Sequence, residues 1–226
     1  MRPLGIHLSV ANSRESADEE RRVARDFADR QTKALIVVSA LHDHAEYAQL
    51  QARGVPIVFV DRPAENLAAD SVVFDNRAGG RLAARHLRDA GHSRIAFIGD
   101  FAWLPTSRER MAGMADVLDG DAPVWRELRT DVHDVASARA ATAGLLALDE
   151  PPTAIVAGNN RILLGAREQI GEAADAPALV GFDDAEWARL LGITVVTGDV
   201  EALGRRAAAL AVRLLADHRH SSEQVV

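Results

Sequence analysis

Two carboxylate side chains directly follow short apolar runs of this sequence. Asp61 follows Pro56–Val60, and Asp183 follows Ala178–Phe182. Carboxylates accept hydrogen bonds from hydroxyl groups. A buried site for hydroxyls needs such partners, because an unpaired polar group there costs about 1–3 kcal/mol. The pattern therefore favours recognition of a neutral polyhydroxyl ligand.

Another carboxylate, an amide and a guanidinium group lie shortly after other apolar runs. Asp100 comes shortly after Arg94–Ile98, and Asn159 comes shortly after Thr153–Ala157. Arg108 lies a few residues beyond Asp100, at the start of an expected helix. Its guanidinium would offer a rigid fork of donors to a ligand.

Each of these residues also has an explanation that needs no ligand. Asp61 and Asp183 could be turn residues after a strand, and Asn159 could only cap a helix. Arg108 could be one charge of an exposed Arg-Glu-Arg run. With both interpretations open, the candidate effector-binding residues are Asp61, Arg108, Asn159 and Asp183.

The elements that must position these side chains alternate between strand and helix. Continuously apolar runs such as Ile57–Val60 and Ala154–Ala157 are typical of strands buried on both faces of a parallel sheet. The expected strands are Gly5–Ala11, Ala34–Ser39, Pro56–Val60, Val72–Phe74, Arg94–Ile98, Thr153–Ala157, Ala178–Phe182 and Ile193–Val196.

Segments of helical period lie between the strands. Asn76–Ala90 is one example, where Asn76 can cap the start and Gly91 can close the end. The other expected helices are Ser16–Arg30, Ser107–Leu118, Asp134–Leu148, Arg161–Gly171 and Val200–Asp217. This alternation predicts a doubly wound α/β fold, and the number of strands favours two sheets. Ligands of such sheets sit beyond the carboxyl ends of the strands.

Composition excludes several classes of function. Cysteine is absent, which excludes disulfide scaffolds and thiol catalysis. The net charge is −7, with arginines interleaved with acids, so this chain alone is a poor nucleic-acid binder. No run approaches the roughly 20 apolar residues of a membrane helix. With no apolar leader, we expect a cytoplasmic protein without a membrane partner.

No motif in the sequence indicates a cofactor or a catalytic site. His42-Asp43-His44 lacks a third metal ligand at a recognisable spacing, so a solvated helix start is favoured over a metal site. Gly79-Gly80 is not part of a phosphate-binding pattern. No Ser/His/Asp set can be assembled. We expect no catalytic residues, no metal and no cofactor, and a protein that is not an enzyme.

Several motifs occur in one order that resembles the LacI/GalR family of transcriptional regulators. They include a strand that ends in Asp61, a helix–Gly-His–strand pattern over 74–99, and an S-x-R-x-x-G-like region over 107–113. A strand–Asn–helix segment over 152–166, Gly181-Phe182-Asp183 and the Leu203-Gly204 region complete the series.

The resemblance implies two Rossmann-like lobes of the type I periplasmic-binding-protein kind, with an effector in the cleft between them. It implies lobes formed by 1–99 plus 198–217 and by 100–197 plus 218–226. The chain would cross between them around Gly99–Phe101, Val196–Gly198 and Asp217–Ser221. It also places Asp61, Arg108, Asn159 and Asp183 at positions that bind an effector.

The sequence departs from the family pattern in two respects. The DNA-binding headpiece, and the first strand and helix of the core, do not precede Gly5. The aromatic residue that usually stacks on the ligand falls near Asp131-Val132, so we expect that ring to be lost.

The resemblance implies the sensing core of a regulator. A small effector, a sugar or sugar derivative, would control DNA binding by a headpiece absent from this sequence, and the core would form a homodimer. Two alternatives remain: a solute-binding protein of a sugar transporter, and a relic fold without effector binding. The resemblance and composition do not identify the effector or the operator.

Overall fold

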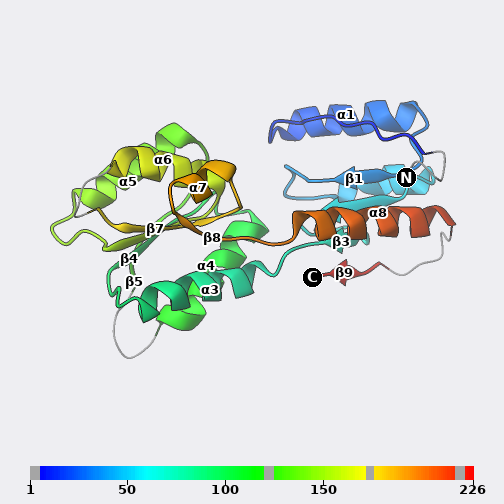
Figure 1. Ribbon diagram of the computed structural model, residues 1–226. Coiled ribbons are helices and arrows are strands. Elements are labelled where there is room, and N and C mark those ends of the chain that lie inside the picture. The colour runs from blue at the N-terminus through cyan, green and yellow to red at the C-terminus, as the bar shows by residue number, and fades with distance from the viewer. Residues whose placement is uncertain (1–5, 120–124, 172–175, 217–221) are drawn as a thin grey trace. The chain divides into compact units, whose positions relative to one another are not determined.

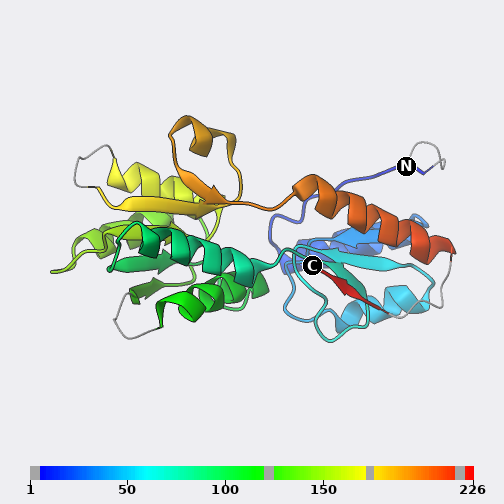
Figure 2. The same ribbon diagram turned by 60° about the horizontal axis from the view of Figure 1, so that its bottom comes forward.

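The computed structural model describes residues 6–119, 125–171, 176–216 and 222–226. It contains two compact units, Met1–Val73 with Val200–Val226, and Phe74–Asp199. Each unit is a parallel sheet flanked by helices (Figures 1 and 2). The predicted α/β class with two Rossmann-like lobes is confirmed.

The first unit holds four parallel strands in the order β1-β2-β3-β9. Its elements in chain order are α1 (Ala17–Asp29), β1 (Leu35–Val37), the 3-10 turn η2 (Ala45–Tyr47), α2 (Ala48–Ala52), β2 (Ile57–Val60), β3 (Asp70–Val72), α8 (Val200–Ala216) and β9 (Gln224–Val225).

Successive side chains of β2 pack against different helices, because a strand points alternate residues to opposite faces of its sheet. Ile57 and Phe59 belong to a cluster that includes Ala24 of α1. Val58 and Val60 pack instead with residues of α8. Helices α1 and α8 therefore cover opposite faces of this sheet (Figure 1).

The second unit holds five parallel strands in the order β5-β4-β6-β7-β8. Its elements in chain order are α3 (Asn76–Asp89), β4 (Ile95–Ile98), α4 (Pro105–Leu118), β5 (Trp125–Arg129), α5 (Val135–Leu146), β6 (Ala154–Ala157), α6 (Asn160–Ile170), β7 (Ala178–Phe182), α7 (Glu186–Leu190) and β8 (Thr194–Val196).

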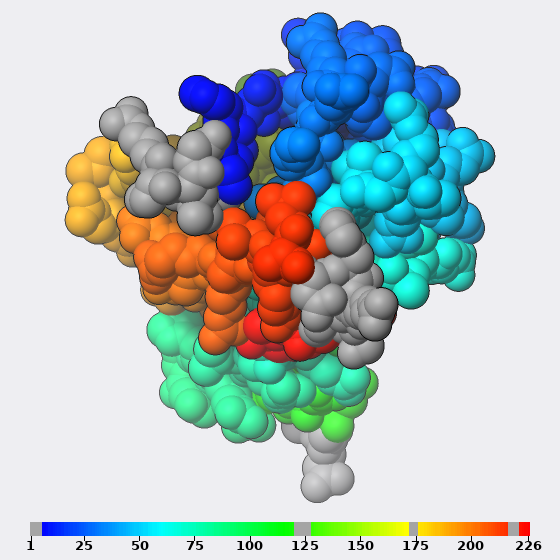
Figure 3. Space-filling view, turned by 90° about the vertical axis from the view of Figure 1, so that its right-hand side faces the viewer, coloured from blue at the N-terminus to red at the C-terminus, as the bar shows by residue number. Residues whose placement is uncertain are grey.

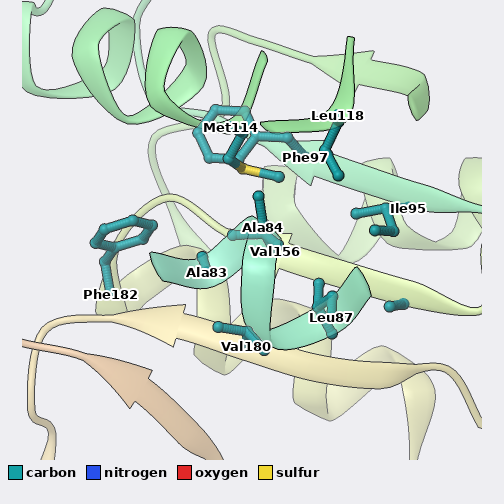
Figure 4. Close-up of a cluster of buried hydrophobic side chains, with 11 residues drawn as sticks. Ala83, Ala84, Leu87, Ile95, Phe97, Met114, Leu118, Val156, Val180 and Phe182 are labelled. Carbon is teal, nitrogen blue, oxygen red and sulfur yellow. The ribbon is translucent and has the colours of Figure 1, made fainter. Parts of the chain in front are cut away.

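Two apolar clusters fill the faces of this sheet. On one face, Phe97, Val156 and Val180 pack against Leu87 of α3 and Met114 of α4 (Figure 4). On the other face, the intervening residues of the same strands pack against α5 and α6. The central strands are thus buried on both sides, as their continuous apolar sequence predicts.

Helices α3 and α4 approach each other at two glycines. A Cβ atom on Gly80 would lie 2.0 Å from the carbonyl oxygen of Arg110, and one on Gly113 would lie 2.0 Å from that of Arg77. No real Cβ atom tolerates such distances. Because α4 sits so close to α3, Arg110 reaches the end of the sheet described below.

The units differ from the predicted lobes 1–99 plus 198–217 and 100–197 plus 218–226. Strand β4 pairs with β5 and β6, so it belongs to the five-stranded sheet together with α3. The prediction followed the order of motifs, and that order does not show which strands pair. Long-range pairing decides the boundary.

One crossing point differs for the same reason, because the chain leaves the first unit after Val73 rather than around Gly99–Phe101. The chain returns to the first unit after Asp199, next to the predicted crossing around Val196–Gly198. The third predicted crossing, at 217–221, lies outside the described residues. After it, β9 pairs with β3, so the last described residues stay with the first unit.

One expected strand does not form. In the described part of Gly5–Ala11, residues 6–11 form neither a helix nor a strand. A strand needs a neighbour for its backbone hydrogen bonds, and this segment has none among the described residues. Strands β5 and β9, which the sequence patterns did not predict, do form.

None of the helices in the described ranges combines the length and the apolar content that crossing a lipid bilayer requires.

Candidate functional site

Polar side chains gather at the carboxyl edge of the five-stranded sheet. Asp100 follows β4, His133 follows β5, Asn159 follows β6 and Asp183 follows β7. These strands are neighbours, so their carboxyl ends open on one edge of the sheet. This is the edge at which ligands of open parallel sheets bind.

The first group at this edge, the Asp100 group, consists of Asp100, His133 and Asn159. The Nδ1 atom of His133 lies 2.9 Å from Oδ1 of Asp100, and Nδ2 of Asn159 donates to Oδ2 of Asp100 at 2.8 Å. Asn159 also accepts from the backbone N–H of Ile162 and so caps α6. Asn159 therefore holds both its predicted cap role and a place beside Asp100.

An aromatic stack adjoins the Asp100 group. The ring of Phe101 lies 4.6 Å from that of His133 and 6.2 Å from that of Trp103, with each pair nearly parallel. Val132, where the family aromatic was expected to be lost, is buried in the core. Val132 supplies no ring, but Phe101 and Trp103 supply flat aromatic faces at the same edge.

Next to His133, Asp134 begins α5 with a capping box. Its carboxylate accepts from the backbone N–H of Ser137 at 2.7 Å. This backbone hydrogen bond is the main reason that the pKa of Asp134 is lowered. The carboxylate of Asp134 therefore caps α5, and this cap holds the loop that carries His133 at the start of the helix.

The second group, the Arg110 group, consists of Arg110, Asp183 and Asn76. The Nη2 atom of Arg110 lies 3.7 Å from Oδ1 of Asp183, and its Nε donates to Oδ1 of Asn76 at 2.8 Å. The guanidinium also lies 4.4 Å over the ring of Phe182 and donates to the carbonyl of Gly158. Four residues therefore fix the position of this cation.

Asp183 presents the accessible charge of the Arg110 group. Its side chain is 46% exposed, whereas that of Arg110 is 10% exposed. The backbone of Asp183 has a left-handed φ of 70°, which Asp tolerates better than most residues. A left-handed backbone conformation at a residue other than glycine is strained, and such strain concentrates at functional sites.

Arg108 does not join either group. It is exposed, and its Nη1 donates to the carbonyl oxygen of Trp103 at 2.7 Å. Arg110, two positions later on α4, is the arginine that lies beside Asp183, and the role of Arg108 toward an effector stays a prediction. The helical period could have shown that Arg110 faces inward, because Ser107, Arg110 and Met114 lie on the buried face of α4.

Asn76 is the other residue that sequence reasoning misplaced. Asp75, not Asn76, caps α3, since its carboxylate accepts from the backbone N–H of Ala78 at 2.7 Å. Asn76 lies in the first turn and is buried against Arg110. Asp75 and Asn76 are both plausible caps by type, so the sequence does not choose between them.

Asp61 stands at the carboxyl end of β2 in the first unit. It has the same left-handed backbone as Asp183, with φ 68°, and its side chain is 32% exposed. The Nε atom of Arg62 lies 3.9 Å from its Oδ2. The two units therefore end an inner strand in the same way, and the role of Asp61 toward a ligand stays a prediction.

Within the described ranges, no three His, Asp or Glu side chains are grouped to hold a metal ion. Asp43 of the His42-Asp43-His44 run instead accepts from the backbone N–H of Ala45 and from Asn66. These hydrogen bonds lower the pKa of Asp43, the backbone one most strongly. The carboxylate of Asp43 therefore accepts hydrogen bonds at the start of η2.

Comparison with known proteins identifies the family. The profile of the periplasmic binding protein domain matches residues 3–219. A helix-turn-helix (HTH)-type transcriptional regulator from Streptomyces limosus is 32% identical over 74% of this chain and 51% of its own length. MalR from Streptomyces coelicolor is 30% identical over 88% of this chain and 62% of its own. The chain spans about half to two thirds of these relatives.

Solved structures share the fold. Cra from Pseudomonas putida, in complex with fructose 1-phosphate, has a TM-score of 0.88 at 24% identity over 99% of this chain and 86% of that chain. A LacI family regulator from Enterococcus faecalis with bound ribose has a TM-score of 0.85 at 18% identity over 99% and 84%. A periplasmic solute-binding protein from Actinobacillus succinogenes with bound D-allose has a TM-score of 0.83 at 17% identity over 97% and 84%.

At these identities the structures show the fold alone, whereas the profile match extends over nearly the whole chain. The predicted resemblance to LacI/GalR regulators is confirmed by the curated relatives, which are HTH-type transcriptional regulators. The chain belongs to the periplasmic binding protein domain family, in the form found in LacI/GalR-type transcriptional regulators.

Proposed function

We propose that this chain is the ligand-sensing core of a LacI-type transcriptional regulator and binds a neutral sugar at the carboxyl edge of its five-stranded sheet. The observation that carries the proposal is the pairing of Asp183 with Arg110. The buried guanidinium of Arg110 holds the half-exposed carboxylate of Asp183 in one orientation. The solvent-facing lone pairs of this carboxylate can then accept hydrogen bonds from two adjacent hydroxyl groups of a ligand.

The aromatic stack supports the same class of ligand. Sugar rings present an apolar face of C–H groups as well as hydroxyls, and the flat sides of Phe101 and Trp103 would bury that face. The Asp100 group then supplies a second set of acceptors and donors beside the rings. Because Arg110 is already paired with Asp183, the site favours a neutral sugar over a sugar phosphate.

Regulation is favoured over transport by the curated relatives. The solved neighbours include both regulators and a transporter's solute-binding protein, so the fold does not separate the two functions. The curated relatives from Streptomyces limosus and Streptomyces coelicolor are transcriptional regulators, not enzymes. On this proposal the protein acts in the cytoplasm, and a DNA-binding segment outside these residues reads out the ligand.

A binding screen tests the proposal. Purified protein is titrated by calorimetry with ribose, D-allose, other neutral monosaccharides and fructose 1-phosphate. We expect a neutral sugar to bind, and the Asp183→Asn variant to bind it about 10- to 100-fold more weakly. Loss of a charge-assisted hydrogen bond costs roughly 1.5–3 kcal/mol, and 1.4 kcal/mol is tenfold.

The matched control is Asp184→Asn. Asp184 is the exposed neighbour of Asp183 and belongs to neither group at the sheet edge. The control should bind the sugar like the parent. A folded protein that binds no member of the panel would contradict the proposal and favour a relic fold. A neutral sugar bound equally by both variants would refute the assigned site.

A homodimer is the second element of the proposal. Helix α3 carries Leu82, which is 57% exposed although it lies on a regular amphipathic helix. Closed two-fold dimers are the commonest assemblies of such proteins, and an exposed leucine is a natural contact. Light scattering at micromolar concentration should give a dimer mass. Leu82→Glu should lower that mass, and a monomeric parent would refute the proposal.

A further inference from the structure

One ring nitrogen of His133 is open at the carboxyl edge of the five-stranded sheet. The side chain of His133 is 29% exposed, and its Nδ1 atom is the one that pairs with Asp100. No described residue forms a hydrogen bond with Nε2. The buried side-chain nitrogens and oxygens that lack a partner in the described part of the chain do not include Nε2, so solvent reaches this atom.

Asp100 determines which ring nitrogen of His133 carries the proton. An ionised carboxylate only accepts hydrogen bonds, so the Nδ1 atom, 2.9 Å from Oδ1 of Asp100, must donate. In a neutral imidazole the other nitrogen is then an acceptor. The Nε2 atom of His133 therefore presents a lone pair to a molecule bound at this edge.

The other side-chain acceptors of the Asp100 group are already used. The Oδ1 atom of Asp100 also accepts from the backbone N–H of Phe101 at 2.7 Å, and Oδ2 accepts from Nδ2 of Asn159 at 2.8 Å. The Oδ1 atom of Asn159 accepts from the backbone N–H of Ile162 at 2.8 Å. Within this group, Nε2 of His133 is therefore the acceptor that receives no hydrogen bond from the described residues.

Hydrogen bonds between two loops hold His133 in place without a ligand. The backbone N–H of Asp131 donates to the carbonyl oxygen of Asp100 at 3.2 Å, and Oδ1 of Asp131 accepts from the backbone N–H of Ala102 at 3.0 Å. The ring of Phe101 stacks on that of His133. A side chain that is fixed in advance loses little conformational entropy when a ligand binds.

The histidines of the first unit lack this combination of features. His44 is buried, and its Nδ1 accepts from the backbone N–H of Glu65, so its neutral ring carries the proton on Nε2. His7 lies on the N-terminal segment, deep blue in Figure 3, and is exposed to solvent. His133 instead combines a fixed ring with an open acceptor, at the edge where ligands of parallel sheets bind.

We propose that Nε2 of His133 accepts a hydrogen bond from a hydroxyl group of the sugar, and that Asp100 is the positioning residue that keeps the ring proton on Nδ1. This inference rests on the proposed function and adds a requirement to it. The sugar must carry a hydroxyl that points at His133, because a methoxy group, a fluorine or a deoxy carbon there offers no proton to Nε2. His133 thus selects among neutral sugars by one hydroxyl.

Nitrogen NMR of the ligand-free protein tests the tautomer first. Protein with isotope-labelled histidine is recorded at pH 8, and the His133 signals are assigned by their loss in His133→Phe. We expect the ring proton on Nδ1 in the parent. Asp100→Ala removes the acceptor, so the form with the proton on Nε2 should appear. A parent spectrum with the proton on Nε2 would overturn the proposal.

A double comparison of sugars and protein variants then identifies the hydroxyl. The probes are the D-aldopentoses and D-aldohexoses with their monodeoxy forms, titrated by calorimetry. At one ring position, removal of the hydroxyl should weaken binding to the parent about 3- to 10-fold, as expected for one neutral hydrogen bond. The same removal should leave the affinity of His133→Phe unchanged, since this variant keeps a ring against Phe101 but has no acceptor.

A second variant and a matched control complete the comparison. His133→Asn keeps an amide donor toward Asp100 but has no atom at the position of Nε2, so it should behave like His133→Phe. The control is His92→Phe. His92 lies before β4, with its Nδ1 atom 3.0 Å from the hydroxyl oxygen of Thr153. The control should respond to the deoxy sugars as the parent does, and thermal melting confirms that each variant is folded.

The outcomes separate this inference from the proposed function. If a sugar binds, but each deoxy form weakens binding equally in the parent and in both His133 variants, His133 only joins the two loops. The inference would then be overturned while the sugar site stands. If no sugar binds to the folded parent, the proposed function and this inference are both overturned.

Discussion

The two units begin from the same sequence pattern and end with different burial. Ile155 and Val156 of β6 are fully buried, whereas Ile36 and Val38, in an equally apolar run, are about half exposed. Strand β6 has neighbours on both sides, and β1 has one neighbour within the described part of the chain. An apolar run therefore indicates a strand that can be buried, but whether its side chains are buried depends on the neighbouring strands and helices.

The units also stabilise themselves by different means. The second unit relies on close helix packing, with α3 and α4 in contact through glycines. The first unit relies in part on a buried polar centre. There the carboxylate of Glu20 accepts from the Ser39 hydroxyl at 2.6 Å and from the Tyr47 hydroxyl at 2.8 Å. Burial, with the neighbouring charge of Glu20, raises the pKa of Tyr47.

The comparison predicts that a single methyl group will damage the second unit most. Gly80→Ala places a Cβ against the Arg110 backbone, so α3 and α4 must separate, at a cost of about 3 kcal/mol. The loss can be followed by tryptophan fluorescence, because Trp103, Trp125 and Trp187 all belong to this unit.

The matched control is Gly144→Ala on α5, where an added Cβ meets nothing within 4 Å. The same change there should stabilise the unit by about 0.5–1 kcal/mol, since alanine favours a helix over glycine. If both variants were equally destabilised, close helix packing would not be the special feature of the second unit.

In the first unit, Glu20→Ala should cost roughly 2–4 kcal/mol, because it leaves buried hydroxyls and the backbone N–H of Ala40 without their acceptor. Hydrogen exchange should report opening of Met1–Val73 while the tryptophan signal of the other unit persists. Glu19→Ala, at the partly exposed neighbour, should change little. Unfolding of both units together would show that they are not separate.

A smaller difference concerns mild acid. His44 is buried beside Phe59, and this burial is the main reason that its pKa is lowered. Because the unfolded chain protonates this histidine more readily, its contribution to stability is complete above about pH 6.5 and is lost as the pH falls through the lowered pKa. Denaturant unfolding of the first unit should give a lower free energy of unfolding at pH 5.5 than at pH 7.5.

The variant His44→Asn can still accept from the backbone N–H of Glu65, as His44 does at 2.8 Å. It should flatten the pH dependence of the first unit between these two values. An unchanged slope would assign that dependence to other groups.

The smallest effect concerns stronger acid and the second unit. Arg77 and Arg81 donate to Asp116, and these hydrogen bonds hold its pKa at about 2. This lowered pKa stabilises the fold above about pH 4, and the contribution is lost as the pH falls from 4 toward 2. Asp116→Asn should flatten the tryptophan-monitored acid transition in that range, and Asp89→Asn should leave it as in the parent.

Much of the fold was predictable because its signals are local. The expected runs contain β2, β4, β6 and β7, and the expected helices correspond to the long helices within a few residues. The site was predicted in part. The position of Asp183 and Asn159 at the sheet edge was predictable because each closely follows a strand, and their contact with an effector stays a prediction. The position of Arg110 beside Asp183 was not predicted, because two arginines of one short run differ only in the face of the helix that they occupy.

The sequence by itself determined most of the strands, the long helices, the family resemblance and the aspartates that directly follow strands. These features depend on a few consecutive residues and their backbone preferences. Only the tertiary structure decided where one unit ends, which arginine meets Asp183, and that residues 6–11 do not form a strand. Each of these depends on a partner far away in the chain, and a local pattern does not specify which partner is present.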